Sequence, residues 1–581
     1  MFKLFKKFDV KDWLMILLIV GFVVLQVWLD LTMPDYTSKL TQSVASGDLS
    51  MKEIWKNGGM MLLCAFGSLA SSFACGFICA FLAGKFSKKL RAEVYNKTFS
   101  FSSAEMKKFS VSSLMTRTTN DIQHIQGFVA MGLQSIIKAP TLAIWAITKI
   151  SNTSVEWTTA TIITVSILVL VVALITIFVL PKFKKVQKQI DELNATAREN
   201  VSGVRVVRAF NAENYQEEKF EKTNANLTKT QLFTAKLMGI LSPFMTLCMN
   251  GLTLAICWIG AILVNQASFF ERPEVIGNMT AFTQYAGLVI MAFIMLIVIF
   301  VFLPRSIVSA RRVNEVLETK PSILNGNQTK SQDEVKGKVE FVNVGFKYPD
   351  GQNEVISNIN FSASSGETVA IIGATGSGKT TLINLIPRFL DATQGQVLVD
   401  NIDVKEYDYN TLQDKIAVVS QKACLFMGDI KSNVGYGARG DFDEDKIKKS
   451  LEIAQADFVN DISEGLNAKV SQGGTNFSGG QKQRLSIARA VYKDAEIIIF
   501  DDSFSALDYK TDMLVRKALK KEMKDKTVII VAQRIGTIKT ADKIIVLDNG
   551  KIAGIGTHEQ LLKTCDEYKQ IALSQLDKEE L

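Results

Sequence analysis

Apolar residues gather in the first half of the chain in six long runs. All six lie within the first 305 residues, and each has the length of roughly 20 residues that a helix needs to cross a bilayer. We expect membrane spans near residues 13–33, 60–84, 127–149, 157–181, 238–264 and 279–303. The pattern therefore predicts an integral membrane protein.

The hydrophobic pattern changes after the sixth run. Residues 318–337 are polar, contain Pro321 and lack periodicity, which is typical of a linker. Beyond them, short β-rich segments such as ETVAIIG alternate with helix-like ones such as TLINLIPRFL, as in an α/β domain. We expect a membrane domain over 1–317 with an N-terminal interfacial helix, a linker over 318–337 and an α/β domain over 338–581.

Two polar segments between the spans are too long to be turns. They cover roughly residues 85–126 and 182–237, contain few Gly or Pro, and favour helix. The spans are therefore expected to continue well below the membrane as helices.

Lys and Arg fix the orientation of the membrane domain. They are concentrated at the N-terminus and in the two long polar segments, whereas the other connections carry few. Cytoplasmic segments hold the excess of positive charge, so both termini and both long segments are predicted to be cytosolic. The net charge of +8 is explained by this asymmetry, and we find no nucleic-acid-binding module. The seven cysteines lie mostly inside spans and indicate no disulfide framework.

Lys138 and the methionines of the spans leave two interpretations open. Lys138 falls near the middle of the third run, where a charge is costly unless it faces water or a polar partner. It lines a cavity, or else the border of the span is shifted or the side chain reaches to the membrane interface. The methionines suit a surface that adapts to varied apolar ligands, or they face lipid or lie in the core. They are Met238, Met245, Met249, Met279, Met291 and Met295.

A glycine-rich loop follows the ETVAIIG segment. It fits the pattern G-x-x-x-x-G-K-[ST] and lies between a predicted strand and a predicted helix. Backbone N–H groups of such a loop cradle phosphates, its lysine reaches the outer phosphates, and its hydroxyl can bind Mg²⁺. We expect ATP and Mg²⁺ at Gly373, Ala374, Thr375, Gly376, Ser377, Gly378, Lys379, Thr380 and Thr381.

Four further segments have the order of one particular family. They are FKYP with Tyr348, VVSQKACLF with Gln421, FSGGQKQRLSIARA at 477–490, and EIIIFDD followed by SALD at 505–508. This set resembles the ATP-binding-cassette (ABC) family. Behind six spans it is similar to an exporter-type half-transporter, as in bacterial multidrug and lipid exporters. The implied fold is an α-helical membrane domain with long cytosolic extensions, followed by an α/β P-loop NTPase domain.

The resemblance implies a role for each motif. Tyr348 would stack on adenine, while Thr380, Gln421 and Asp501 would surround Mg²⁺. Ser478, Gly479, Gly480, Gln481 and Asp508 are also assigned to nucleotide binding, and the signature segment that begins at Ser478 would close over ATP held by a second cassette. A Ser-Gly-Gly turn is equally a helix cap, and the two readings are compatible. The segments near 113–125 and 200–220 resemble the cytosolic helices that touch cassettes, and the second would dock on the partner's cassette.

Two residues depart from the family pattern. Asp502 stands where a catalytic Glu is expected, and Gln533 stands where a switch His is expected. The two histidines, His124 and His558, are both far from that strand in sequence. Because both altered positions handle the attacking water, we expect this chain to hold ATP and to hydrolyse it slowly. Gln472, before the signature, replaces a frequent Glu.

These departures favour a heterodimer. The partner would be a homologous half-transporter with Glu and His at the altered positions, whose competent site the intact signature of this chain completes. The predicted activity is ATP-driven export of amphipathic drugs, lipids or peptides across a bacterial-type plasma membrane, with the cassette in the cytosol. The alternatives are an ATP-gated regulatory or channel-like protein and a homodimeric lipid flippase.

Overall fold

The computed structural model describes residues 2–47, 51–151, 154–329, 336–349, 351–438 and 442–575. The chain divides into two compact units. The first comprises Met1–Lys97 and Ser112–Thr319, and the second comprises Thr98–Val111 and Lys320–Leu581. Part of the predicted linker, residues 330–335, lies outside the described residues.

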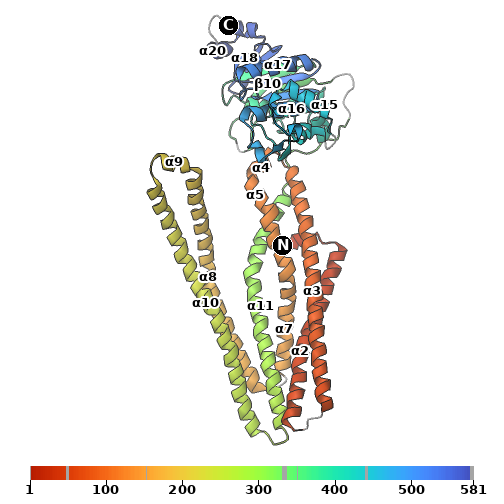
Figure 1. Ribbon diagram of the computed structural model, residues 1–581, viewed down its shortest axis with the longest axis vertical. Helices are drawn as coiled ribbons and strands as arrows, with labels where there is room; N and C mark the ends of the chain where they lie inside the picture. Colours follow the sequence, from red (N-terminus) through yellow and green to blue (C-terminus); the bar gives the residue numbers. More distant parts are fainter. Residues whose placement is uncertain are drawn as a thin grey trace. The chain divides into compact units, whose positions relative to one another are not determined.

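The first unit is helical. Six helical stretches are long and apolar enough to cross a membrane, as the sequence predicted. They are Val10–Ala45, Met51–Phe99, Val111–Ser151, Val155–Ser202, Glu213–Gln266 and Arg272–Leu296. The corresponding helices are α2 (Val10–Ala45), α3 (Met51–Phe99), α7 (Leu133–Ser151), α8 (Val155–Ser202), α10 (Glu213–Gln266) and α11 (Arg272–Glu318). In Figure 1, α2, α3, α7 and α11 lie side by side.

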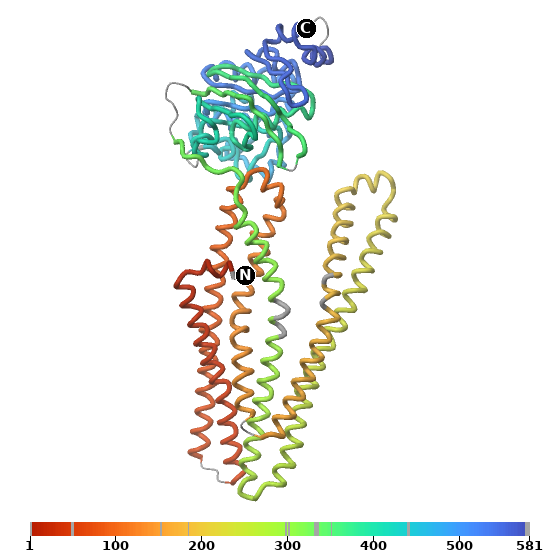
Figure 2. The backbone as a smooth tube through the Cα atoms, turned by 180° about the vertical axis from the view of Figure 1, so that it is seen from behind, coloured from red at the N-terminus to blue at the C-terminus, as the bar shows by residue number. Residues whose placement is uncertain are grey.

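Four helices extend far beyond a bilayer. α3, α8, α10 and α11 contain 49, 48, 54 and 47 residues, more than twice the roughly 20 that cross the hydrocarbon core. α8 and α10 run together as a two-helix arm that ends in α9 (Val204–Ala209) (Figures 1 and 2). Gln189 on α8 donates to the carbonyl oxygen of Asn226 on α10 at 3.2 Å. The predicted helical extensions are therefore present.

The third span is reached through short and π-helical segments. α5 (Val111–Thr116), the π-helix η1 (Arg117–Asp121), α6 (Ile122–Gly127) and the π-helix η2 (Phe128–Gly132) precede α7. Arg117 donates to the Arg312 carbonyl oxygen and to Glu315, both at 2.8 Å. The region near 113–125 therefore packs on α11 inside the first unit.

The N-terminal segment packs on the cytosolic part of α3. It contains the four-residue helix α1 (Phe2–Phe5), followed by Phe8, whose ring meets Phe86 edge to face at 4.6 Å. Lys7 pairs with Glu93. The predicted interfacial helix is therefore one turn long, and its place in a membrane interface stays a prediction.

The second unit holds two main sheets. The larger has the order β12-β11-β3-β10-β9-β6, in which the only antiparallel pair among the described strands is β11 with β12. These strands are β3 (Thr368–Gly373), β6 (Ile416–Val419), β9 (Ile497–Asp501), β10 (Thr527–Val531), β11 (Lys543–Asp548) and β12 (Lys551–Gly556). An antiparallel sheet has the order β2-β1-β4-β5, with β1 (Val339–Phe346), β2 (Ile356–Ala363), β4 (Gln394–Val399) and β5 (Ile402–Asp403). A short pair joins β7 (Gly428–Asp429) to β8 (Lys469–Val470).

Helices surround the parallel sheet. They are α12 (Lys379–Leu385), α13 (Tyr409–Lys415), α14 (Ile430–Val434), α15 (Glu444–Ile453), α16 (Gly479–Lys493), α17 (Tyr509–Glu522), α18 (Ile535–Ile538), α19 (His558–Thr564) and α20 (Asp566–Leu573). β9 shows why the strands read as unbroken apolar runs: Ile497 and Ile499 belong to one core, while Ile498 and Phe500 belong to the other. A strand covered on both faces needs apolar residues at every position.

The predicted linker is partly built into the cassette. The backbone N–H of Gly326 donates to the carbonyl oxygen of Tyr407 at 3.0 Å, and that of Gln328 donates to Glu406 at 2.9 Å. A Cβ on Gly326 would lie 2.2 Å from the Glu406 carbonyl oxygen, so this close approach requires glycine. Residues 326–328 thus extend the domain by one short, paired segment.

A cytosolic helix of the first long loop belongs to the second unit. α4 (Ser103–Phe109) opens with a capping box in which Ser102 and Glu105 each bond the other's backbone N–H. The second oxygen of Glu105 accepts a hydrogen bond from the backbone N–H of Ser322 at 3.2 Å. α4 is therefore a part of this loop that packs within the second unit, and the role predicted for the region near 113–125 stays a prediction.

Candidate nucleotide-binding site

The phosphate loop lies between β3 and α12. Gly376 and Gly378 have φ angles of +87° and +97°, a region that favours glycine. A Cβ on Gly378 would lie 2.6 Å from Ile356, and one on Gly373 would lie 2.1 Å from the Leu547 carbonyl oxygen. Ala374, Thr375 and Gly376 are exposed. The loop is therefore held tightly at its ends and open at its centre.

Lys379 is buried at the start of α12. Its ammonium group donates to the carbonyl oxygens of Gly373 and Ala374 at 2.7 and 2.8 Å. Burial lowers the pKa of Lys379, and the carboxylates of Asp502 and Asp501 oppose that shift. Phosphate oxygens would supply a further opposite charge to this buried group. The position agrees with the role that the sequence gave to Lys379.

A hydroxyl and a carboxylate meet beside the loop. Thr380 donates from Oγ1 to Oδ1 of Asp501 at 3.2 Å. Burial raises the pKa of Asp501, and the hydrogen bond from Thr380 opposes that shift. Hydroxyl and carboxylate oxygens are ligands that Mg²⁺ accepts, together with phosphates. The residues present fit a nucleotide-bound Mg²⁺, which would neutralise phosphate charge when bound.

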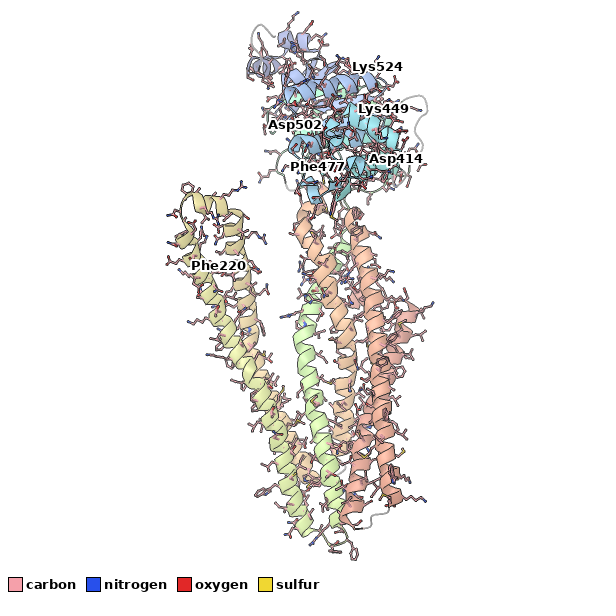
Figure 3. All side chains as sticks on the ribbon, in the orientation of Figure 1. Phe220, Asp414, Lys449, Phe477, Asp502 and Lys524 are labelled. Carbon is pink, nitrogen blue, oxygen red and sulfur yellow. The ribbon has the colours of Figure 1, made fainter. Side chains whose placement is uncertain are left out.

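Asp502 is the centre of the predicted catalytic position (Figure 3). Its side chain is buried, and its backbone has a φ of +49°. Gln533 donates from Nε2 to Oδ2 of Asp502 at 2.9 Å, and Gln421 donates from Nε2 to the same oxygen at 3.2 Å. A carboxylate accepts only, so the amide oxygen of Gln533 points away from Asp502. Gln421, predicted beside Mg²⁺, thus contacts Asp502.

The three residues come from the ends of three adjacent strands. Asp502 follows β9, Gln533 follows β10, and Gln421 follows β6. Parallel strands end at the same edge of a sheet, where ligands bind in open α/β folds. The structure therefore brings together the altered pair that the sequence singled out.

Tyr348 lies beside the same site in the second unit. Its hydroxyl is 3.2 Å from the hydroxyl of Thr381, and its ring meets Phe346 edge to face. The ammonium of Lys107, in the last turn of α4, lies 4.7 Å from the ring centre, within the range of a cation–π interaction. Sequence reasoning missed Lys107, since nothing beside it in the sequence marks it.

The signature segment opens α16. Ser478 accepts a hydrogen bond from the backbone N–H of Gln481 at 3.3 Å, and the Gln481 side chain accepts one from Ser478 at 2.8 Å. The predicted helix cap is therefore confirmed. Ser478 and Gly479 are exposed, and a helix N-terminus attracts anions. The role of this segment toward ATP held by a second cassette stays a prediction.

Asp508 caps α17 in the same manner. Its Oδ2 accepts a hydrogen bond from the backbone N–H of Thr511 at 3.1 Å. The hydrogen bonds with Thr511 lower the pKa of Asp508. Ser478 and Asp508 thus lie at exposed helix starts, on elements other than the strand ends that carry Asp501 and Asp502.

A membrane domain of six long helices and a P-loop domain with this site define an ATP-driven membrane transporter. The family model described as "ABC transporter transmembrane region" matches residues 16–293, and the one described as "ABC transporter" matches 356–505. The chain belongs to the ABC transporter family. It is an exporter with a fused membrane domain and cassette, spans the membrane several times and has a cytosolic cassette.

Several known proteins are similar along most of the chain. An uncharacterised ABC transporter ATP-binding protein of Mycobacterium tuberculosis (strain ATCC 25618 / H37Rv) is 38% identical over 521 residues, which is 89% of this chain and 87% of the relative. An ATP-dependent lipid A-core flippase of Syntrophus aciditrophicus is 31% identical, over 86% of this chain and 82% of the flippase. The structure of a bacterial Atm1-family ABC exporter with ATP bound has a TM-score of 0.80 at 21% identity, covering 96% and 98% of the two chains. This last likeness shows the fold.

Proposed function

We propose that this chain is one subunit of a heterodimeric exporter, in which its own phosphate loop forms a slowly hydrolysing ATP site. The observation that carries the proposal is the hydrogen bonding of Asp502. Two amide groups donate to its Oδ2, from Gln421 at 3.2 Å and from Gln533 at 2.9 Å. That oxygen is occupied, so it is a poor acceptor for a proton from water.

The short side chain of Asp502 is also expected to slow ATP hydrolysis. Asp is one methylene shorter than the Glu of the family pattern, and a base misplaced by about 1 Å can cost on the order of a hundredfold in rate. The Gln533 amide does not titrate, so it cannot relay a proton as imidazole does. Lys379 and the glycine-rich loop remain suited to hold phosphates. The site is thus suited to binding more than to hydrolysis.

The signature segment of this chain, unlike Asp502 and Gln533, shows no departure from the family pattern. Ser478, Gly479 and Gly480 retain the family pattern, with Ser478 and Gly479 exposed at the start of α16. In the proposed heterodimer they complete the site of a partner that carries Glu and His at the altered positions. A homodimer would pair every such signature with a slow site.

The arm formed by α8 and α10 supports an obligatory partner. Its tip exposes apolar side chains, with Val206, Phe210 and Tyr215 being 61%, 78% and 67% exposed. Exposed apolar patches mark interaction surfaces. We infer that this tip docks on the cassette of the partner subunit.

The transported molecule belongs to the amphipathic class. Drugs, lipids and peptides all have this character, and flippases of lipid A-core are among the relatives. Membrane lipids surround the spans and are also candidate cargo. The plasma membrane of a bacterial-type cell is the proposed location.

The first test is ATP hydrolysis by the purified chain in lipid. We expect feeble hydrolysis, and we expect Asp502→Glu combined with Gln533→His to raise it by roughly a hundredfold, the scale of general-base catalysis. Lys379→Met supplies the background rate. Vigorous hydrolysis by the unaltered chain alone, or no gain in the double variant, would contradict the proposal.

A homodimeric flippase is the second candidate, and the similarity to lipid A-core flippases favours it. In that case the chain alone should move a fluorescent lipid across reconstituted vesicles in an ATP-dependent way. The heterodimer predicts lipid movement only after addition of the partner. A persistent ion current in a planar bilayer would instead indicate the channel-like alternative.

A further inference from the structure

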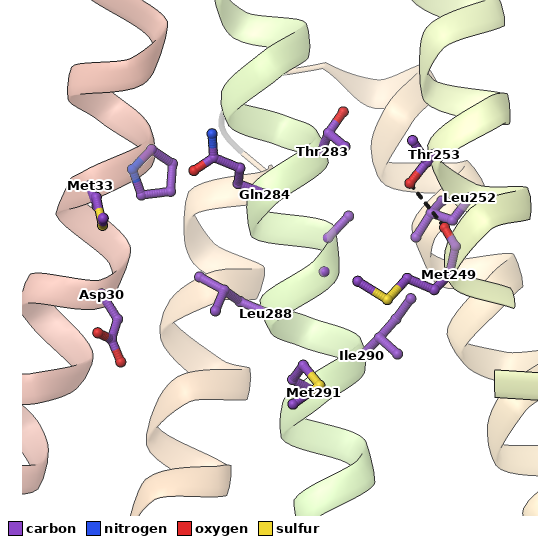
Figure 4. A pocket seen from close by; sticks show the side chains of 13 residues that line it. Asp30, Met33, Met249, Leu252, Thr253, Thr283, Gln284, Leu288, Ile290 and Met291 are labelled. Carbon is purple, nitrogen blue, oxygen red and sulfur yellow. Dashed lines mark hydrogen bonds between the residues drawn. The ribbon is translucent and has the colours of Figure 1, made fainter. Parts of the chain in front are cut away.

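A pocket of about 630 Å³ opens among three helices of the first unit. Its walls come from α2, α10 and α11 (Figure 4). Most of its lining is apolar, including the flexible thioethers of Met33, Met249 and Met291. The volume is in the range of pockets that hold drug-sized ligands, and methionine side chains adapt to ligands of irregular shape.

One carboxylate supplies the charge of this pocket. Of the described residues that line it, Asp30 is the sole ionisable one, and Gln284, Thr253 and Thr283 add neutral polar groups. Thr253 and Thr283 donate their hydroxyl hydrogens to backbone carbonyl oxygens of their own helices. They can therefore only accept from a ligand, like Asp30.

Asp30 has hydrogen-bonding capacity to spare. Its Oδ1 accepts a hydrogen bond from the hydroxyl of Ser68. Its Oδ2 lies 3.5 Å from Nζ of Lys138, which is longer than a normal N–H···O bond. A carboxylate offers about four acceptor positions, so the ion pair leaves room for a second cation.

Asp35, five residues further along α2, is the contrasting case. Nζ of Lys149 donates to it at 2.7 Å, and the hydroxyl of Tyr285 donates to its other oxygen. Asp35 does not line the pocket. The two carboxylates therefore differ in their access to a ligand. Asp35 bonds Lys149 and Tyr285 outside the pocket, whereas Asp30 lines the pocket.

The same geometry gives Lys138 a polar partner within the bundle. Lys138 lies behind Asp30 as its ion-pair partner and is not among the residues that line the pocket. Such pairing is how membrane proteins retain an acid within a span. Lys138 lowers the cost of keeping Asp30 ionised without filling the cavity.

Asp30 is placed toward the outer end of its span. It follows the first residue of α2, Val10, by 20 positions, and at 1.5 Å per residue this is about 30 Å along the helix. Because the N-terminus is cytosolic, the carboxylate belongs to the outward part of the membrane domain.

We propose that this pocket binds an amphipathic organic cation, with its positive group against Asp30 and its apolar body on the methionines. An anion would meet the Asp30 carboxylate with no opposing charge in the lining, and a wholly apolar ligand would cover the exposed part of that carboxylate without bonding to it. The proposal rests on the export function, whose cargo it narrows. It does not depend on how the two ATP sites divide hydrolysis.

The test compares two ions of the same shape and opposite charge. The full-length chain in phosphatidylcholine nanodiscs, without ATP, is titrated with tetraphenylphosphonium and with tetraphenylborate, and binding to empty nanodiscs is subtracted. We expect the phosphonium ion to bind at least roughly tenfold more tightly, about 1.4 kcal/mol. Equal binding of the two ions by the unaltered chain would overturn the proposal. This comparison needs no variant to fold.

Two substitutions on α2 locate the charge. Asp30→Asn should weaken phosphonium binding by roughly tenfold and should not weaken borate binding. Asp35→Asn, the same change on the same helix, should leave the affinity for phosphonium unchanged. Wild-type affinity in Asp30→Asn, or an equal loss in Asp35→Asn, would overturn the proposal. Because no ATP is present, either failure leaves the proposed slow ATP site untouched.

Discussion

At the scale of residues, the geometry around Asp502 supports the proposal that this chain hydrolyses ATP slowly. The identity of Asp502 and Gln533 could be read from the sequence, because both fall at fixed positions after predicted strands. Their mutual hydrogen bond could not, since a sequence gives no distances across a sheet. Nor could it show that Gln421 donates to the same oxygen. The sequence thus predicts two altered residues, and the structure adds that Oδ2 of Asp502 accepts hydrogen bonds from two amide groups.

Gln533→Leu tests the hydrogen bond to Asp502 separately from the missing imidazole at position 533. The change removes one donor from Oδ2 of Asp502 and adds no group that titrates, so we expect hydrolysis to become faster, by less than the roughly hundredfold expected of the double variant, and ATP binding to be unchanged. Single-turnover hydrolysis and nucleotide binding measure the two quantities. A complete loss of turnover would show that the amide takes part in the chemistry.

At the scale of elements, the spans and the strands of the parallel sheet were predictable because each has a strong periodic or apolar signal. The paired segment at 326–328 was not, since its hydrogen bonds are made by the backbone and leave no pattern in polar side chains. The choice of α4 as the cassette contact was likewise hidden. Several helical stretches in that loop have similar composition, and packing alone distinguishes them.

The ion-paired Lys415 at the end of α13 is a stability determinant of the cassette. It donates to Asp400 and Glu496, both at 2.8 Å, and the Asp400 carboxylate is fully buried. Lys415→Met would leave that carboxylate without its partner, which costs about 3–5 kcal/mol in buried pairs. We expect a marked fall in the melting temperature of the cassette. Lys526→Met, which breaks the more exposed pair with Asp494, should cost less than about 1 kcal/mol.

His558 on α19 makes stability depend on pH. Its Nδ1 lies 2.7 Å from the hydroxyl of Tyr568 on α20. Burial lowers the pKa of His558 below its usual 6.5, and nearby Lys539 adds to the shift. The unfolded chain therefore binds the proton first, so stability present above pH 6.5 is lost as the pH falls toward the lower folded pKa.

His558→Gln should remove this dependence. Thermal unfolding of the wild type and the variant is compared at neutral pH and below the usual pKa of histidine. We expect the difference in melting temperature between them to shrink on acidification. A constant difference across this range would show that His558 keeps the same pKa in both states.

At the scale of the whole molecule, the first unit holds the membrane spans and the second holds the nucleotide-binding site. α4 comes from a loop of the membrane domain but belongs to the second unit. The family, the six spans and the cytosolic cassette followed from the sequence with little ambiguity. The partner did not, because one sequence carries no information on a second chain. The proposal of a docking partner rests on the exposed apolar side chains at the tip of the α8–α10 arm.

Phe210→Asp tests the docking of this tip. The side chain is 78% exposed beside α9, so the change should not harm folding, while a charge in an apolar interface is costly. We expect loss of the ATPase stimulation that follows mixing with the partner subunit, and unchanged ATP binding. Phe269→Asp, equally exposed at 78% in the loop between α10 and α11, is the control and should keep the stimulation.

The backbone conformation at position 502 favours the residue that suits folding stability over the one that suits fast ATP hydrolysis. With φ at +49°, position 502 lies in a conformation in which Asp and Asn are among the residues best tolerated. A Glu there would reach further toward water but would suit the turn less well. Lineages selected for heat resistance would thus retain Asp, and those selected for pumping rate would move to Glu and replace the lost stability elsewhere.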